Sequence, residues 1–158
     1  MNGTVSSPGG GIQNSEESPS ASESESYGAS FQTLIPVRWG DLDARQHLNN
    51  TLYFRFMEEG RIQAFHRFGA EGLASEGIIL ASIGCDFLRS ITYPATAPVT
   101  HRVTGIGRSS LDMEVLIERS DEPGVLYARG REVLVWVNYD SGKSMPWPEH
   151  VLTHLRPK

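Results

Sequence analysis

Residues 37–53 bring together the side chains of this sequence that are best suited to acid–base chemistry. Two carboxylates, one imidazole and two amides occur within this short stretch: Asp41, Asp43, His47, Asn49 and Asn50. A carboxylate can attack a carbonyl carbon or activate water for that attack, and a nearby donor can stabilise the oxyanion that develops. The stretch is therefore the first place to look for a reaction centre.

The flanking sequence indicates which elements position this cluster. Residues 34–39 alternate and contain Val and Trp, which predicts a strand, whereas Leu52–Phe68 has the pattern of a helix. The cluster would then lie at a helix N-terminus, where either Asn49 or Asn50 can serve as the N-cap. The unpaired N–H groups and partial positive charge of such a terminus suit a developing oxyanion.

This segment resembles the signature of the 4-hydroxybenzoyl-CoA thioesterase-like hotdog proteins, roughly R-[WF]-x-D-x-D-x-x-G-H-[VL]-N-N-x-x-Y, followed by a helix with E-E-x-R. The matching positions are Arg38, Trp39, Asp41, Asp43, His47, Leu48, Asn49, Asn50, Tyr53, Glu58, Glu59 and Arg61. Gln46 stands where the family usually has Gly. Because Gln tolerates positive φ poorly, the shape of the loop before His47 stays open here.

The resemblance runs from about residue 31 to the end and implies the hotdog fold. This is an α+β fold in which a curved, mostly antiparallel five-stranded sheet wraps one long central helix. Alternating side chains independently predict four extended runs, over residues 78–90, 97–107, 110–119 and 125–138. The periodicity alone would predict only an α+β fold.

The resemblance also implies an activity, namely hydrolysis of an acyl-CoA thioester in a cleft between two subunits. An uncovered edge strand favours pairing with another chain, so we expect a homodimer or a homotetramer. Two other functions stay open: a non-catalytic acyl-CoA-binding module, and an enoyl-thioester hydratase that uses an Asp/His pair. The motif fits the hydratase branch poorly.

By the same resemblance, Asp43 is the catalytic carboxylate, acting as nucleophile or general base, and the backbone N–H of Asn50 polarises the thioester carbonyl. Asp41 is expected to be structural and to bond loop amides. His47 has two interpretations: it orients water or the carboxylate, or it is a hydrogen-bonded loop residue. Asn49 likewise either touches substrate or caps the helix, with capping favoured.

The segment Gly107-Arg108-Ser109-Ser110 is similar to a family loop between two later strands. There Arg108 could meet a CoA phosphate, with Ser109 and Ser110 as further donors. A solvated turn is the alternative, because Ser is common in turns for local reasons.

Composition separates a tail from a domain. Residues 1–30 hold nine Ser, five Gly and four Glu without Lys or Arg, which predicts a disordered tail before a thioesterase domain at 31–158. The four Glu leave 15 acidic and 14 basic residues elsewhere, so we expect no nucleic-acid partner. No leader or membrane-spanning stretch is apparent, which favours a cytoplasmic protein that binds no membrane.

The remaining chemistry-bearing residues give weaker signals. No Cys/His spacing resembles a metal site, so we expect neither a metal nor a cofactor other than the CoA of the substrate. The single cysteine, Cys85, is expected to be a small buried residue. On the predicted helix Arg61 falls inside the apolar arc, where a semi-buried pair with Glu58 is the favoured interpretation.

Overall fold

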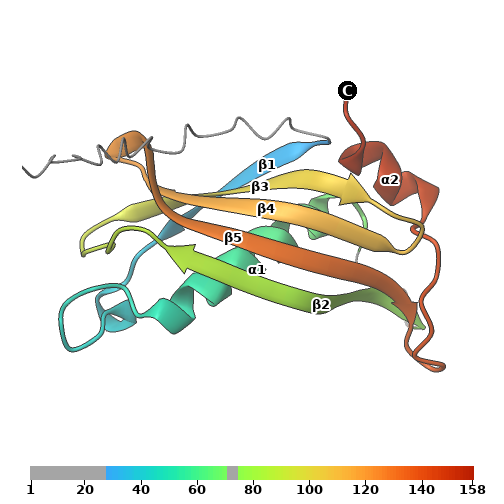
Figure 1. Ribbon diagram of the computed structural model, residues 1–158, viewed down its shortest axis with the longest axis horizontal. Coiled ribbons are helices and arrows are strands. Elements are labelled where there is room, and N and C mark those ends of the chain that lie inside the picture. The colour runs from blue at the N-terminus through green and yellow to red at the C-terminus, as the bar shows by residue number, and fades with distance from the viewer. Residues whose placement is uncertain (1–27, 71–74) are drawn as a thin grey trace, which may run out of the picture.

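The computed structural model describes residues 28–70 and 75–158, which form one five-stranded sheet and two α-helices (Figure 1). In chain order the elements are β1 (Ser30–Pro36), the short 3-10 helix η1 (Trp39–Asp41), α1 (Asn50–Arg67), β2 (Glu76–Phe87), β3 (Thr96–Ile106), β4 (Ser110–Arg119), β5 (Glu122–Asn138) and α2 (Glu149–Leu155). The sheet order is β1-β3-β4-β5-β2, and every neighbouring pair is antiparallel. The predicted α+β hotdog fold is confirmed, and the four predicted runs correspond to β2–β5.

Figure 1 shows α1 running across one face of the curved sheet. The strands present an alternating apolar face to it, as strand geometry requires. The buried side chains of β4, for example, are Leu111, Met113, Val115 and Ile117. From the helix, Phe56 and Met57 are fully buried against this face. The core therefore fills the layer between α1 and the sheet.

The first strand lies earlier than the sequence predicts. We expected a strand over residues 34–39, but β1 ends at Pro36 and Trp39 begins η1, with its side chain 71% exposed. The chain turns because the backbone N–H of Arg38 donates to the Asp41 carboxylate at 2.8 Å. The alternating pattern that predicted a strand to residue 39 therefore extends beyond β1, into a turn that the Asp41 side chain stabilises.

The fold also includes residues that composition assigned to the tail. The N–H of Gly28 donates to the carbonyl of Val103, and that of Ala29 donates to the carbonyl of Leu155, both at 3.0 Å. A Cβ on Gly28 would lie 2.5 Å from the Leu155 oxygen, so glycine is required for this close approach. Ser30 begins β1, and the two residues before it are hydrogen-bonded to the domain; the rest of the expected tail lies outside the described residues.

Arg61 finds a different partner from the one expected. Its Nη1 lies 2.5 Å from Oε1 of Glu132, on β5, rather than pairing with Glu58 on its own helix. Both partners are buried, and a buried charge needs a close counter-charge. His101, on β3, completes the cluster, with Nε2 3.6 Å from Oε2 of Glu132. Arg61 therefore pairs with Glu132 because α1 packs on the sheet, and its spacing from Glu58 along the helix does not decide its partner.

The last strand of the sheet has an open edge. Within the described residues β2 pairs with β5 alone, and several of its apolar side chains are exposed, among them Ile79 at 44% and Leu80 at 40%. Cys85 lies on this strand and is half-buried, so the expectation of a buried cysteine is only partly met. Burial nevertheless raises the pKa of Cys85 to about 11, with the nearby Asp86 carboxylate adding to the shift.

Candidate active site

The loop between η1 and α1 is held closed by Asp43. Its Oδ1 accepts hydrogen bonds from the backbone N–H groups of Arg45 at 2.8 Å and His47 at 3.2 Å. The backbone N–H of Asp43 donates in turn to the carbonyl of His47 at 2.7 Å. Three bonds across a few residues fix the carboxylate relative to the chain that leads into the helix.

Gln46 adopts the left-handed conformation, with φ at 63°. This is the region in which Gly is favoured and side chains are disfavoured. The N–H of Gln46 donates to the carbonyl of Asp43 at 3.0 Å, which helps to hold the strained residue. The departure of Gln46 from the family pattern therefore leaves the backbone in the conformation that Gly would adopt.

Asp41 lies in a different environment from Asp43, although only one residue separates them. It is 3% exposed, accepts from the backbone N–H of Arg38, and pairs with the guanidinium groups of Arg38 at 3.1 Å and Arg55 at 3.4 Å. Burial acts to raise its pKa, but the hydrogen bonds and charge of Arg38 hold the pKa below its ordinary value. Asp41 thus ties η1 to α1, which agrees with the expected structural role, but the loop amides that we expected it to bind donate to Asp43 instead.

The first turn of α1 supplies a hydrogen-bond donor beside this loop. Asn49 is the N-cap, because its side-chain oxygen accepts from the N–H of Thr51 at 3.0 Å and from the Thr51 hydroxyl at 2.8 Å. The capping interpretation of Asn49 is confirmed. Within the described residues no acceptor takes the backbone N–H of Asn50, the first residue of the helix. That N–H is available to a ligand.

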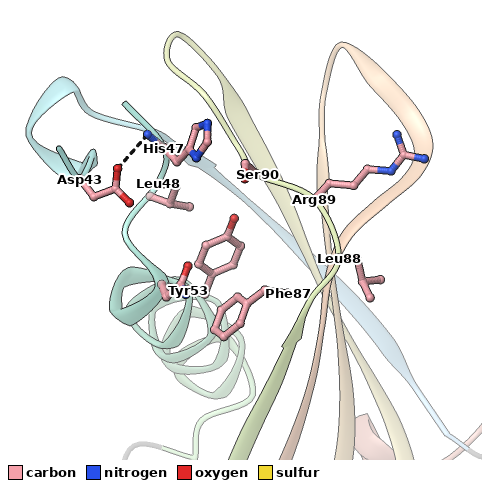
Figure 2. Close-up of a pocket in the computed structure, with 9 residues that line it drawn as sticks. Asp43, His47, Leu48, Tyr53, Phe87, Leu88, Arg89 and Ser90 are labelled. Atoms are coloured by element: carbon pink, nitrogen blue, oxygen red, sulfur yellow. Dashed lines mark hydrogen bonds between the residues drawn. The ribbon is translucent and has the colours of Figure 1, made fainter. Parts of the chain in front are cut away.

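A small cleft of about 150 Å³ lies beside these groups (Figure 2). The lining residues are Asp43, His47, Leu48, Asn50, Tyr53, Phe87, Leu88, Arg89 and Ser90. The three catalytic candidates from the sequence, Asp43, His47 and Asn50, therefore line one cleft. Sequence reasoning missed the opposite wall, which is built from the end of β2 and the segment after it. No local pattern marks that wall, because its contact with the loop depends on the long-range packing of β2.

His47 approaches Asp43 through its backbone. The hydrogen bond between the two residues is made by the His47 N–H, and Figure 2 shows the imidazole directed toward Ser90 instead of the Asp43 carboxylate. Among the described residues the ring makes no hydrogen bond. The geometry of the single chain thus agrees better with the loop-residue interpretation of His47 than with a carboxylate–imidazole pair.

The predicted CoA-phosphate residues lie at the other end of the sheet. Thr96, at the start of β3, pairs with Pro36 near the Asp43 loop, whereas Arg108 follows the far end of β3. The 11 residues of β3 span roughly 30 Å, so Arg108 and Asp43 of one chain cannot contact the same small group. Ser109 and Ser110 belong to the same tight turn, in which the N–H of Gly107 donates to the carbonyl of Ser110.

Arg108 lines a second and larger cleft of about 720 Å³. Its walls come from the β3–β4 turn and the C-terminal segment, including Trp147, Leu152 and Arg156. Arg156 is paired with Glu149 at 2.5 Å, whereas the Arg108 guanidinium forms no ion pair with the described part of the chain. A guanidinium of this kind could receive a phosphate.

The described ranges contain no group of three or more His, Cys, Asp or Glu side chains arranged to hold a metal ion. Over the same ranges, neither α-helix is both long enough and apolar enough to cross a membrane.

A family model described as the thioesterase-like superfamily matches residues 37–155, which is most of the chain. The chain belongs to this superfamily. Membership confirms the resemblance noted from the D-x-D and H-L-N-N residues, and it makes the chain a thioester hydrolase by class.

Solved structures of proteins similar to this thioesterase-like chain have the same fold. A putative thioesterase from Pseudomonas aeruginosa is 36% identical, with a TM-score of 0.74 over 77% of this chain and 95% of that one. A thioesterase from Thermus thermophilus, complexed with coenzyme A and Zn, is 32% identical, with a TM-score of 0.66 over 78% of this chain and 90% of that one. Among curated proteins, the uncharacterized protein YsmA of Bacillus subtilis is 29% identical over 80% of this chain and 88% of its own length.

Proposed function

We propose that this protein hydrolyses acyl-CoA thioesters in the cleft beside Asp43. The observation that carries the proposal is that the Asp43 carboxylate and the free N–H of Asn50 line the same cleft. Thioester hydrolysis needs such a pair, since a base or nucleophile must act on one side of the carbonyl carbon while a donor stabilises its oxygen.

The two carboxylate oxygens of Asp43 have different environments. Oδ1 is occupied by the N–H groups of Arg45 and His47, while Oδ2 accepts no hydrogen bond from the described residues. Oδ2 is therefore the atom proposed to react. As a general base it removes a proton from water, the water oxygen bonds to the carbonyl carbon, and the C–S bond breaks with CoA leaving as a thiolate that is then protonated.

A nucleophilic route uses the same atom. Oδ2 would bond to the carbonyl carbon as the C–S bond breaks, and water would then hydrolyse the resulting mixed anhydride to the free acid. In both routes negative charge develops on the carbonyl oxygen, where the Asn50 N–H and the positive end of α1 can stabilise it. Neither route needs a cofactor beyond the CoA of the substrate.

The comparisons support CoA as the carrier. The Thermus thermophilus relative was solved in complex with coenzyme A, and the Pseudomonas aeruginosa relative is described as a putative thioesterase. Both exceed 30% identity and cover more than three quarters of this chain. A panel of acyl-CoA substrates identifies the acyl group that this protein accepts.

We further propose that Arg108, with Ser109 and Ser110, binds the CoA phosphates of a substrate held by a second copy of the chain. Two observations support this arrangement. In one chain Arg108 and the Asp43 loop lie at opposite ends of β3, a strand roughly 30 Å long. In addition, the unpaired edge of β2, with exposed Ile79 and Leu80, offers a surface for a homo-oligomer.

The two other candidate functions are less well supported. A module that only binds acyl-CoA has no need of a carboxylate beside an unpaired helix N–H. A hydratase of the kind considered needs an Asp/His pair, whereas the Asp43–His47 contact runs through the His47 backbone.

The experiment compares wild type with Asp43→Asn on a panel of acyl-CoAs, with a thiol reagent to detect free CoA. We expect kcat to fall by about a hundredfold or more, because one catalytic group is lost. Asp140 is exposed in the turn that follows β5, so Asp140→Asn is the matched control and should leave kcat unchanged. A folded Asp43→Asn protein with the wild-type rate would reject the assignment, and CoA release by neither protein would reject the function.

A further inference from the structure

Tyr53 lines the cleft but has no part in the reaction described so far. Its side chain is 2% exposed and lies on α1 three residues after Asn50, so the two residues share one face of the helix. Figure 2 shows the phenol directed away from the helix toward Leu48 and Ser90, at the cleft. A buried tyrosine normally uses its hydroxyl in a hydrogen bond, which raises the question of its acceptor.

The ring of Tyr53 is held in place by a second aromatic residue. Phe87 packs edge-on against it, with the ring centroids 5.1 Å apart and the planes at 76°. Phe87 lies at the end of β2 and also lines the cleft. The hydroxyl is therefore fixed before any ligand arrives, which is what a donor to a developing charge requires.

The hydroxyl is suited to donating its proton. Burial raises the pKa of Tyr53, and a hydrogen bond that the phenol oxygen accepts from the backbone N–H of Ile91 acts against that rise. The phenol therefore stays protonated at neutral pH. Because the phenol oxygen is the acceptor in that bond, its own proton is available to a molecule in the cleft.

We propose that the Tyr53 hydroxyl donates a hydrogen bond to the carbonyl oxygen of the bound thioester, as a second donor beside the Asn50 N–H. This inference rests on the proposed function and makes Tyr53 a catalytic residue in it. One donor then comes from the helix backbone and the other from a side chain one turn later. Negative charge on the oxygen would be shared between them as the tetrahedral intermediate forms, while Asp43 acts on the carbon.

The test uses Tyr53→Phe, which removes only the hydroxyl, together with two unreactive CoA analogues that carry the acyl chain of the best substrate. The ketone analogue has CH₂ in place of sulfur and keeps the carbonyl. The thioether analogue has CH₂ in place of the carbonyl carbon and its oxygen. Tyr139→Phe, an exposed tyrosine outside the cleft, is the matched control.

We expect Tyr53→Phe to lower kcat by about a hundredfold, as loss of an oxyanion donor does, with KM changed much less. By calorimetry, the ketone should bind the variant about tenfold more weakly than wild type, and the thioether equally well. Tyr139→Phe should change none of these values. An unchanged kcat, or equal weakening of both analogues, would overturn the inference while leaving thioester hydrolysis intact.

Wild-type protein that binds neither analogue and releases no CoA would instead reject the proposed function, and the role of Tyr53 with it. Should Tyr53→Phe fail to fold, 3-fluorotyrosine at position 53 keeps both ring and hydroxyl while lowering the phenol pKa. The alkaline limb of the kcat profile should then move to lower pH. If the alkaline limb of the pH profile of kcat stays at the same pH, Tyr53 is not the donor.

Discussion

Glu132 Oε1 lies 2.5 Å from Arg61 Nη1 in the buried layer between α1 and the sheet. His101 lies against the other carboxylate oxygen of Glu132, and its ring stacks on Phe31 with centroids 5.2 Å apart. Burial raises the pKa of Glu132 to about 7 and lowers that of His101 to about 4. Between about pH 4.5 and 6.5, folding therefore neutralises the imidazole and protonates the carboxyl group, and this makes stability testable against pH.

The first prediction is that the pH effects of Glu132 and His101 on stability oppose each other. The raised pKa of Glu132 gives stability that is present below pH 4.5 and lost as pH rises through about 7. The lowered pKa of His101 gives stability that is present above pH 6.5 and lost as pH falls through about 4. Between pH 4.5 and 6.5 the two slopes cancel in wild type.

Variants separate the two contributions. In His101→Asn, stability should fall as pH rises from 4.5 to 7, by up to about 1.4 kcal/mol per pH unit. In Glu132→Gln, it should fall as pH decreases from 6.5 to 4. Urea unfolding at several pH values measures both slopes. Parallel pH profiles for wild type and the two variants would contradict the assignment of the proton.

A second prediction concerns Gly60, in the middle of α1. A Cβ there would lie 2.8 Å from Cε1 of His101, whose ring is fully buried and cannot easily move. Alanine would favour the helix by about 1 kcal/mol, but overpacking costs about 1–3 kcal/mol. Gly60→Ala should therefore lower the free energy of unfolding, measured in urea. Gly84→Ala, where no atom lies within 4 Å of the new Cβ, is the control and should not show this loss from overpacking.

The third prediction separates the two aspartates of the D-x-D segment. Asp41→Asn removes the charge that pairs with Arg38 and Arg55 in a buried position, so we expect a loss of about 1–3 kcal/mol in stability. The kcat per folded molecule should change little, in contrast to Asp43→Asn. Denaturation curves and active-site-normalised rates give the two numbers. A larger loss of kcat for Asp41→Asn than for Asp43→Asn, with folding intact, would show that Asp41 is the reacting carboxylate.

The fourth prediction is that two inactive variants complement each other. If Asp43 of one chain acts on CoA held by Arg108 of another, then Asp43→Ala and Arg108→Glu, each weak alone, should regain activity when co-expressed. A hybrid dimer has one site with both defects and one with neither, so up to about half of the wild-type activity can return. Hybrids that show no excess over the separate variants, or a fully active monomer by light scattering, would reject the shared site.

Local sequence was sufficient for one wall of the cleft and insufficient for the other. The N-cap at Asn49 joins residues a few positions apart, so residue types and spacing predict it. The amides of the loop bond to Asp43, whereas we had assigned them to Asp41, because spacing alone does not say which carboxylate faces them. Phe87 reaches the cleft only because β2 folds beside α1, and nothing near Phe87 in the sequence indicates that contact. The same reason explains why Arg61 was assigned to Glu58: Glu132, its partner, is 71 residues away.

The left-handed backbone at Gln46 bears on how related chains are found. The Asp43 loop depends on a backbone angle, and the hydrogen bonds of Asp43 hold that angle with a residue other than glycine. A sequence pattern that requires glycine before the histidine would miss this chain. It would also miss any other chain in which a residue other than glycine adopts positive φ in this turn. A pattern defined by the aspartate and the residues whose amides it binds would recover them.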